Sequence, residues 1–238
     1  MRLFSAGASG AIGRRLAPLL LRAGHEVAGS TRSAETGKAL EQAGVKPAIL
    51  NVFDAPAVIS ALRAAKPEIV IHQLTDLPQE FDQTLISASY ARNARIRTEG
   101  TRNLLAGASA AGARRLVVQS IAFAYSSGDE PHTETDPLNL GDPLRAVTVQ
   151  GVAAMEEMVR TAPGMTAIVL RYGMLYGPGT WHAAAASKPA LHVDAAAQAA
   201  LLALTRGAGI YNIADDDGAV SIAKARRELG FNPDFRLG

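Results

Sequence analysis

Hydrophobic residues along the chain alternate between two periodicities. Short apolar runs, typical of buried strands, separate longer segments in which apolar residues recur every three or four positions, as they do in helices. Such alternation is characteristic of βα units, so we expect an α/β fold with a doubly wound parallel sheet. The pattern predicts two long helices, from about Phe81 to Ala111 and from about Leu144 to Arg160. It predicts seven strands, at Arg2 to Ala6, Glu26 to Ser30, Lys46 to Leu50, Glu68 to His72, Arg115 to Gln119, Thr166 to Leu170 and Gly209 to Ile213.

A glycine-rich turn follows the first predicted strand directly. The segment Gly7-Ala8-Ser9-Gly10-Ala11-Ile12-Gly13 opens an amphipathic helix that is expected to end at Gly24. The first glycine allows a tight turn, the second lets the backbone approach phosphates, and the third lets the helix pack closely on the strand. Backbone N–H groups and the helix dipole then favour an anion. We therefore predict a Rossmann-like dinucleotide site formed by Gly7, Ser9, Gly10, Ile12 and Gly13.

The same N-terminal stretch has one competing interpretation, a secretory signal peptide, because Arg2 precedes apolar residues and small residues follow. Arg14 and Arg15 interrupt the apolar run, and a signal peptide would leave the glycine spacing unexplained. We therefore reject this interpretation.

The end of the second predicted strand indicates which dinucleotide binds. Proteins specific for NAD usually present Asp or Glu there, about 20 residues past the glycine turn, to bind the ribose hydroxyls. This chain has Ser30-Thr31-Arg32, and an arginine can hold a 2′-phosphate through charge-assisted hydrogen bonds. We therefore expect NADP in preference to NAD, with a solvated surface arginine as the alternative. Asn51 and Val52 follow the third strand, where the asparagine carboxamide can meet the adenine, whereas Asp54 is expected only to cap the next helix.

Composition excludes several classes of protein. The 238 residues carry a net charge of +2 and the basic residues are scattered, so we expect no nucleic-acid partner. No stretch reaches the roughly 18 uncharged apolar residues of a membrane span, so we expect a soluble protein with no membrane partner. The chain has no cysteine, which excludes disulfides and cysteine metal sites and favours the cytoplasm. We expect no bound metal.

With these elements placed, the chain resembles the extended short-chain dehydrogenase/reductase family, which contains NAD(P)-dependent epimerases and dehydratases of nucleotide sugars. The resemblance extends over most of the chain, in ordered matches beyond the glycine turn. These matches are Ile69 to His72, Glu99 to Leu105, Leu116 to Ser120, Leu170 to Gly179, Leu191 to Asp194 and Ala223 to Pro233. It implies that Ser120 orients the substrate and that Arg171 and Tyr176 lie on the substrate side of the site.

The chain departs from this family at its acid/base residues. The family has a Tyr, and four residues later a Lys, near the start of the helix that here contains Glu156 and Glu157. The Tyr exchanges the proton of the substrate hydroxyl, and the Lys lowers the pKa of that Tyr and holds the nicotinamide ribose. Counting back from either glutamate places Thr148 or Val149 at the Tyr position, and Val152 or Ala153 at the Lys position.

Other side chains are candidates for the missing proton donor. Tyr125 is the first, because it lies five residues beyond Ser120 on the loop that follows the same strand; Tyr172 and Tyr176 follow the next strand. For each tyrosine the alternative is a packed aromatic ring with a hydrogen-bonded hydroxyl. We expect His132 to be a solvated loop residue and His72 to be a structural residue at a buried strand end.

A second departure concerns length. Only ten residues separate Trp181 from His192, and only Gly218 to Val220 separate Asp217 from Ser221, where the family has parts of its substrate lobe. Either this lobe is trimmed and the site is open, or residues of the lobe are missing from the chain. We predict a Rossmann domain at residues 1–171, to which 192–215 return, and a reduced C-terminal substrate lobe at 172–191 and 216–238.

Two functions are compatible with these observations. The first is an NADP-dependent oxidoreductase of the epimerase/dehydratase branch, which exchanges a hydride with the hydroxyl or carbonyl carbon of an unidentified small molecule through an atypical site. The second is a non-catalytic NADP-binding sensor or regulatory module, which the loss of Tyr and Lys favours. The resemblance also implies a homodimer that pairs the two long helices.

Overall fold

The strands of the protein are bounded nearly as the hydrophobic pattern predicts. The computed structural model describes residues 1–78 and 80–238. Its strands are β1 (Arg2–Ala6), β2 (Glu26–Thr31), β3 (Lys46–Ile49), β4 (Ile69–His72), β5 (Arg115–Ile121), β6 (Thr166–Tyr172), β7 (Met174–Tyr176), β8 (Ala190–His192) and β9 (Gly209–Ile213). The helices are α1 (Ala11–Arg22), α2 (Ala34–Gln42), α3 (Ala55–Ala65), α4 (Gln83–Arg95), the π-helix η1 (Ile96–Gly100), α5 (Thr101–Ala111), α6 (Ala146–Arg160), α7 (Val193–Leu202) and α8 (Ala223–Leu229).

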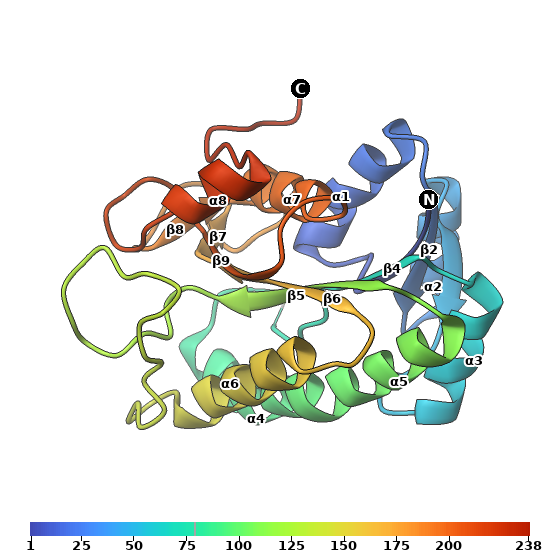
Figure 1. The fold of residues 1–238 in the computed structure, drawn as a ribbon, viewed down its shortest axis with the longest axis horizontal. Coiled ribbons are helices and arrows are strands. Elements are labelled where there is room, and N and C mark those ends of the chain that lie inside the picture. The colour runs from blue at the N-terminus through green and yellow to red at the C-terminus, as the bar shows by residue number, and fades with distance from the viewer. Residues whose placement is uncertain (79) are drawn as a thin grey trace.

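Seven strands form one parallel sheet in the order β3-β2-β1-β4-β5-β6-β9. Figure 1 shows α1, α7 and α8 on one face and α4, α5 and α6 on the other. The α/β, Rossmann-like prediction is therefore confirmed. The direction of winding reverses between β1 and β4, and in such sheets a ligand binds beyond the carboxyl ends of the strands at this point.

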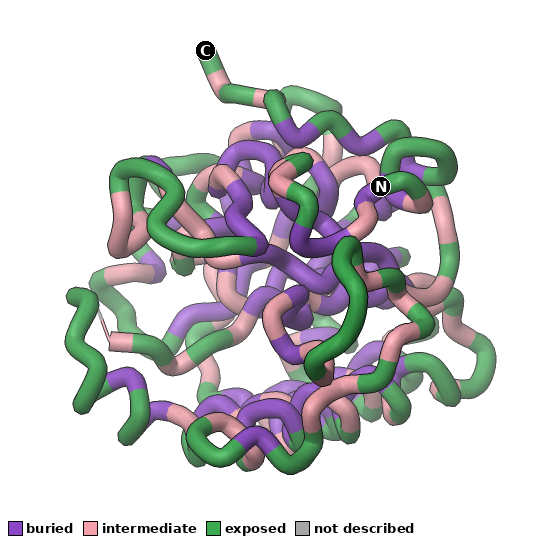
Figure 2. The backbone as a smooth tube through the Cα atoms, turned by 90° about the vertical axis from the view of Figure 1, so that its left-hand side faces the viewer, coloured by how far each residue is buried: buried purple, intermediate pink, exposed green. Residues whose placement is uncertain are grey.

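Buried apolar residues fill both sides of the sheet. One cluster includes Leu16 and Leu20 of α1 and Ile71 and Leu170 of the strands. The other cluster lies against the opposite face and includes Phe4, Leu104 and Met155, among others. Figure 2 shows the buried segments gathered through the middle of the molecule. Because both faces are covered, the central strands are mostly apolar in their middle positions and do not alternate regularly with polar residues.

Two of the predicted helices begin or continue differently from the pattern. The single helix expected from Phe81 to Ala111 is interrupted by η1, which inserts a π turn between α4 and α5. The first part of this segment, α4, begins at Gln83, because the Asp82 carboxylate accepts hydrogen bonds from two backbone N–H groups of the first turn. The helix expected from Leu144 begins at Ala146.

The segment after β6 contains a small feature that the hydrophobic pattern did not predict. β7 and β8 form a two-stranded parallel sheet, in which Tyr176 is in register with His192. The segment from 126 to 141, predicted as a loop, contains no helix or strand; it extends beyond the carboxyl end of β5 in Figure 1. The division of the chain into a Rossmann domain and a reduced lobe stays a prediction.

Candidate dinucleotide site and the residues beside it

The glycine turn has the geometry that a pyrophosphate cradle requires. Gly7 has a positive φ of 90°, and a Cβ atom there would lie 2.7 Å from the carbonyl oxygen of Gln73. A Cβ atom on Gly13 would collide with the carbonyl groups of Gly7 and Ala8. Only glycine fits these two positions, because backbone atoms of Gln73 approach Gly7 and backbone atoms of the turn approach Gly13 too closely for a side chain.

The start of α1 is free to bind an anion. Gly10 is the N-cap residue, no side chain caps the helix, and the first turn contains no acidic residue. Ser9 is half-buried in the turn, and the side chain of Ile12 is buried in the core, so the backbone N–H is the group of Ile12 that faces a phosphate. The site therefore fits the pyrophosphate of a dinucleotide. The individual contacts of these residues with a cofactor stay predictions.

The ends of β2 and β3 hold the residues that we predict to lie beside the adenosine of the cofactor. Arg32 follows β2 directly; its side chain is 76% exposed, and Nη2 lies 3.5 Å from an Asp76 carboxylate oxygen. Asn51 is exposed, with its side-chain oxygen accepting a hydrogen bond from the Phe53 N–H, and Val52 is buried. Asp54 caps α3 through the backbone N–H of Ala57, as expected. The contact of Arg32 with a 2′-phosphate stays a prediction.

The hydroxyl of Ser120 is directed into the protein. Ser120 is 1% exposed, and its Oγ donates a 2.6 Å hydrogen bond to Oε1 of Glu156 on α6. Both oxygens of this carboxylate also accept hydrogen bonds from Arg171, from Nε at 3.0 Å and from Nη2 at 2.6 Å. Burial alone would lower the pKa of the Arg171 guanidinium, but the hydrogen bonds and the charge of Glu156 raise it above its usual range. The role of Ser120 in orienting a substrate stays a prediction.

Tyr125 belongs to the same buried network. Its hydroxyl donates to Oδ1 of Asn212 at 2.6 Å and accepts from Nη1 of Arg171 at 2.8 Å. Burial raises the pKa of this hydroxyl, and the nearby Arg171 opposes the shift only in part. The ring stacks on His132, with centroids 5.0 Å apart. This is the packed arrangement that we gave as the alternative to a proton donor; the catalytic role of Tyr125 stays a prediction.

The residues predicted on the substrate side lie in two separate clusters. Arg171 is 3% exposed; it donates three hydrogen bonds to Glu156 and Tyr125 and a fourth to the backbone carbonyl of Glu134. Tyr176 is half-buried, packs edge-on against His192 and accepts a 3.3 Å hydrogen bond from Arg236 near the end of the chain. The contact of either residue with a substrate stays a prediction.

Helix α6 has neither the Tyr nor the Lys of the family's acid/base pair. Glu156 is the buried glutamate, whereas Glu157 is exposed and pairs with Arg160. Counting from Glu156 therefore places Thr148 at the Tyr position and Val152 at the Lys position. Val152 is fully buried, in a cluster with Ile121, Ala124 and Val149, and the Thr148 hydroxyl has no hydrogen-bond partner among the described residues.

The two histidines differ in how well they were predicted. His72 is buried: its Nδ1 accepts from the N–H of Leu74 and its Nε2 faces the Thr101 hydroxyl at 3.0 Å, so Nε2 carries the proton. Burial lowers its pKa to about 4. The structural role expected for His72 is confirmed. The expectation of a solvated His132 is wrong, because the stack on Tyr125 and a 3.2 Å contact with Asp136 leave its side chain only 14% exposed.

Sequence reasoning missed three residues of this region. Glu156 was used only for counting, and Arg97 and Asn212 were not considered. Asn212 is in register with Arg171 on the neighbouring strand, and Arg171 is in register with Ser120. Polar residues at the carboxyl ends of three adjacent apolar strands are a signal that could have located the network, because parallel strands end at one edge of the sheet.

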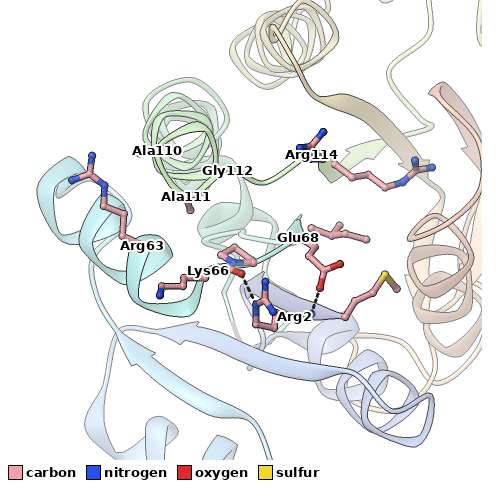
Figure 3. Close-up of a pocket in the computed structure, with 12 residues that line it drawn as sticks. Arg2, Arg63, Lys66, Glu68, Ala110, Ala111, Gly112 and Arg114 are labelled. Atoms are coloured by element: carbon pink, nitrogen blue, oxygen red, sulfur yellow. Dashed lines mark hydrogen bonds between the residues drawn. The ribbon is translucent and has the colours of Figure 1, made fainter.

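A cavity lies at the opposite end of the strands, beside the amino ends of β1, β4 and β5. It has a volume of about 730 Å³ and is lined by basic side chains, including Arg2, Arg63, Lys66 and Arg114, around Glu68. In Figure 3, Arg2 is held by the Lys66 carbonyl and by Glu68. The cavity adjoins the carboxyl ends of α3 and α5, and Arg63 in the last turn of α3 complements the dipole of that helix. It is therefore separate from the dinucleotide crevice.

Comparison with known proteins identifies the family to which this geometry belongs. Residues 6–190 match the model of the NAD dependent epimerase/dehydratase family. The chain belongs to this family. Membership gives it a nicotinamide dinucleotide as cofactor and an oxidoreductase-like function, and the expected resemblance is confirmed.

One curated relative is a 3-diazoavenalumate denitrifying reductase from Streptomyces sp. It is 39% identical to this chain over 242 residues, which cover 92% of this chain and 77% of the relative. Among solved structures, the UDP-glucose 4-epimerase of Thermotoga maritima matches with a TM-score of 0.81 and 18% identity, covering 100% of this chain and 95% of that chain. The Thermus thermophilus enzyme of the same name, solved with NAD, has a TM-score of 0.78, 20% identity and the same coverage. These two similarities establish the fold.

The described residues lack two other kinds of feature. None of their helices combines the length and apolar character needed to cross a membrane. No group of three or more His, Cys, Asp or Glu among them is arranged to hold a metal ion.

Proposed function

We propose that the protein is an NADPH-dependent reductase whose hydride acceptor needs no proton from the protein. The proposal rests on the composition of α6, where Thr148 and the buried Val152 occupy the positions of the family's Tyr and Lys. A threonine hydroxyl has too high a pKa to exchange protons near neutral pH. The Tyr125 hydroxyl, the nearest alternative, already donates to Asn212.

The acceptor class that we propose is an aromatic diazo compound in its cationic, diazonium form. The curated relative is named as a reductase that removes nitrogen from a diazo compound. When bound, reduced nicotinamide supplies a hydride. Adding this hydride to an arenediazonium cation gives a neutral arene and N2, so the overall reaction balances without any further proton. A site without an acid is therefore suited to this substrate and poorly suited to a ketone or an aldehyde.

The chain's own residues would bind and shield the reactants. The glycine turn would hold the pyrophosphate, and the apolar cluster around Val152 would exclude water beside the nicotinamide. Aromatic residues at the carboxyl edge of the sheet support an aromatic substrate. Phe81, after β4, is 53% exposed, and its ring centroid lies 5.8 Å from that of Trp181 and 5.0 Å from that of His182. These rings offer a surface for stacking.

The preference for NADP is supported by the end of β2. The Ser30-Thr31-Arg32 segment has no carboxylate to bind ribose hydroxyls, and the Arg32 side chain is mostly exposed. A guanidinium in this place binds a 2′-phosphate through two charge-assisted hydrogen bonds.

We further propose that the protein is a homodimer located in the cytoplasm. Three apolar side chains on or just before the long helices α4 and α6 are exposed: Leu85, Leu144 and Val147. They would be covered if two copies paired these helices, and sedimentation of the purified protein would measure this. The cytoplasm is supported by the absence of cysteine.

Two measurements test the proposed function. Calorimetric titration should show tighter binding of NADPH than of NADH, and the absorbance of reduced nicotinamide should fall when an arenediazonium salt is added, faster than without protein. Tight binding of NADPH without turnover of diazonium, carbonyl or alcohol substrates would favour the non-catalytic sensor. No binding of either dinucleotide would contradict both functions.

A further inference from the structure

Arg97 is a partly buried cation that the proposed function has not used. It lies on η1, the π turn between α4 and α5, and π turns occur frequently at functional sites. Its Nη1 donates a 3.3 Å hydrogen bond to the backbone carbonyl of Thr148 on α6. No carboxylate in residues 1–78 and 80–238 lies within 4.0 Å of its guanidinium nitrogens.

The surroundings of this guanidinium are unfavourable to its charge. Burial lowers the pKa of Arg97 to about 10, and the more distant charge of Glu156 opposes this only in part. The same positive charge contributes to the lowered pKa of His72. A guanidinium has five N–H donors, and a single neutral carbonyl satisfies one of them. Enclosing such a group is costly unless a further oxygen ligand binds it.

Arg97 contacts the part of α6 in which the family's Lys is missing. In an α-helix the carbonyl of one residue faces the N–H of the residue four positions later. The Thr148 carbonyl is therefore beside Val152, the position of the Lys. The guanidinium that binds this carbonyl therefore reaches from η1 to the turn of α6 that holds position 152.

The expected path of the cofactor passes the same place. The sheet reverses its winding between β1 and β4, so a dinucleotide with its pyrophosphate on α1 lies with adenosine over β2 and nicotinamide over β4 and β5. His72 is the last residue of β4, and its Nε2 lies 3.0 Å from the hydroxyl of Thr101, which follows Arg97 by about one helical turn. Arg97 therefore lies on the nicotinamide side.

We propose that Arg97 replaces the missing Lys as the cation that binds the nicotinamide ribose hydroxyls of the cofactor. This assignment rests on the proposed function, since it requires that a nicotinamide dinucleotide binds. The same oxygen-binding chemistry could serve a carboxylate of the substrate, and the experiment separates these two sources.

The test compares R97Q and R97K with the control R102Q, which alters an exposed arginine on α5. Calorimetry measures the binding of NADPH and of 2′,5′-ADP, which contains only the adenosine half. We expect R97Q to bind NADPH roughly 10- to 100-fold more weakly than the wild type and 2′,5′-ADP equally well. R97K should recover most of the affinity, and R102Q should match the wild type.

Three results would overturn this assignment. R97Q could bind NADPH as tightly as the wild type. It could bind 2′,5′-ADP as weakly as NADPH, which would indicate general damage to the site. It could leave NADPH binding unchanged and raise only the KM of carboxylate-bearing substrates, which would assign Arg97 to the substrate. Failure of the proposed function is distinguishable, because the wild-type protein itself would then not bind or oxidise NADPH.

Discussion

Arg171 on β6 and Glu156 on α6 form a buried two-pronged ion pair, and the Ser120 hydroxyl donates to the same carboxylate. The pair ties α6 to the sheet at the level where the family has its acid/base residues. Removing one partner leaves an uncompensated buried charge, so E156Q should lower the free energy of unfolding by about 3–5 kcal/mol.

Urea unfolding of E156Q and of the matched control E157Q would measure this. Glu157 is exposed and its pair with Arg160 lies on the surface, so the control should change stability by less than about 1 kcal/mol. Equal effects of the two variants would show that the buried pair does not hold α6 in place.

Tyr125 should contribute to stability more than to catalysis. Y125F removes the hydroxyl between Arg171 and Asn212, which leaves the buried Oδ1 of Asn212 without a donor and takes one acceptor from Arg171, and should cost about 1–3 kcal/mol. Because its hydroxyl proton is already donated to Asn212, kcat should fall less than about 10-fold. Steady-state kinetics and urea unfolding of the same sample test both values. A loss of roughly 10²–10⁴-fold in kcat with unchanged stability would instead identify Tyr125 as the proton donor.

Arg32 should discriminate between the two dinucleotides. R32A removes a cation from the end of β2, so the Kd for NADPH should rise roughly 10- to 100-fold, whereas the Kd for NADH should change less than about threefold. Titration of both cofactors into R32A and into the control K38A, an exposed lysine on α2, measures the difference. Equal weakening of NADH and NADPH would refute a role in binding the 2′-phosphate.

His72 should make the protein less stable in mild acid. Burial lowers its pKa from 6.5 to about 4, so the unfolded chain binds its proton first as the pH falls. Its contribution is complete above pH 6.5 and is lost progressively between 6.5 and 4, by about 2 kcal/mol from pH 7 to pH 5. H72Q should lose about that much less stability over this interval in urea unfolding. His25 and His192 are present in both proteins, so the difference isolates His72; identical pH dependences would contradict the account.

The fold and the phosphate cradle were readable from the sequence because both depend on local patterns. Apolar runs set the strands, and the turn at Gly7 needs a residue that tolerates a positive φ. The polar network was not readable, because Ser120, Glu156 and Arg171 meet only after α6 packs on the sheet. The π turn at Arg97 was missed because it spans only Ile96–Gly100, which is too short for its altered periodicity to stand out within a long helical pattern.

The central claim is that reduction here requires a hydride but no proton from the protein. The most direct measurement follows NADPH consumption and N2 release together, with an arenediazonium salt and, separately, with a panel of aldehydes and ketones. The account predicts one N2 released for each NADPH oxidised with the diazonium salt, above the rate without protein, and negligible oxidation with the carbonyl compounds. Efficient reduction of a carbonyl compound with no reaction of the diazonium salt would contradict it.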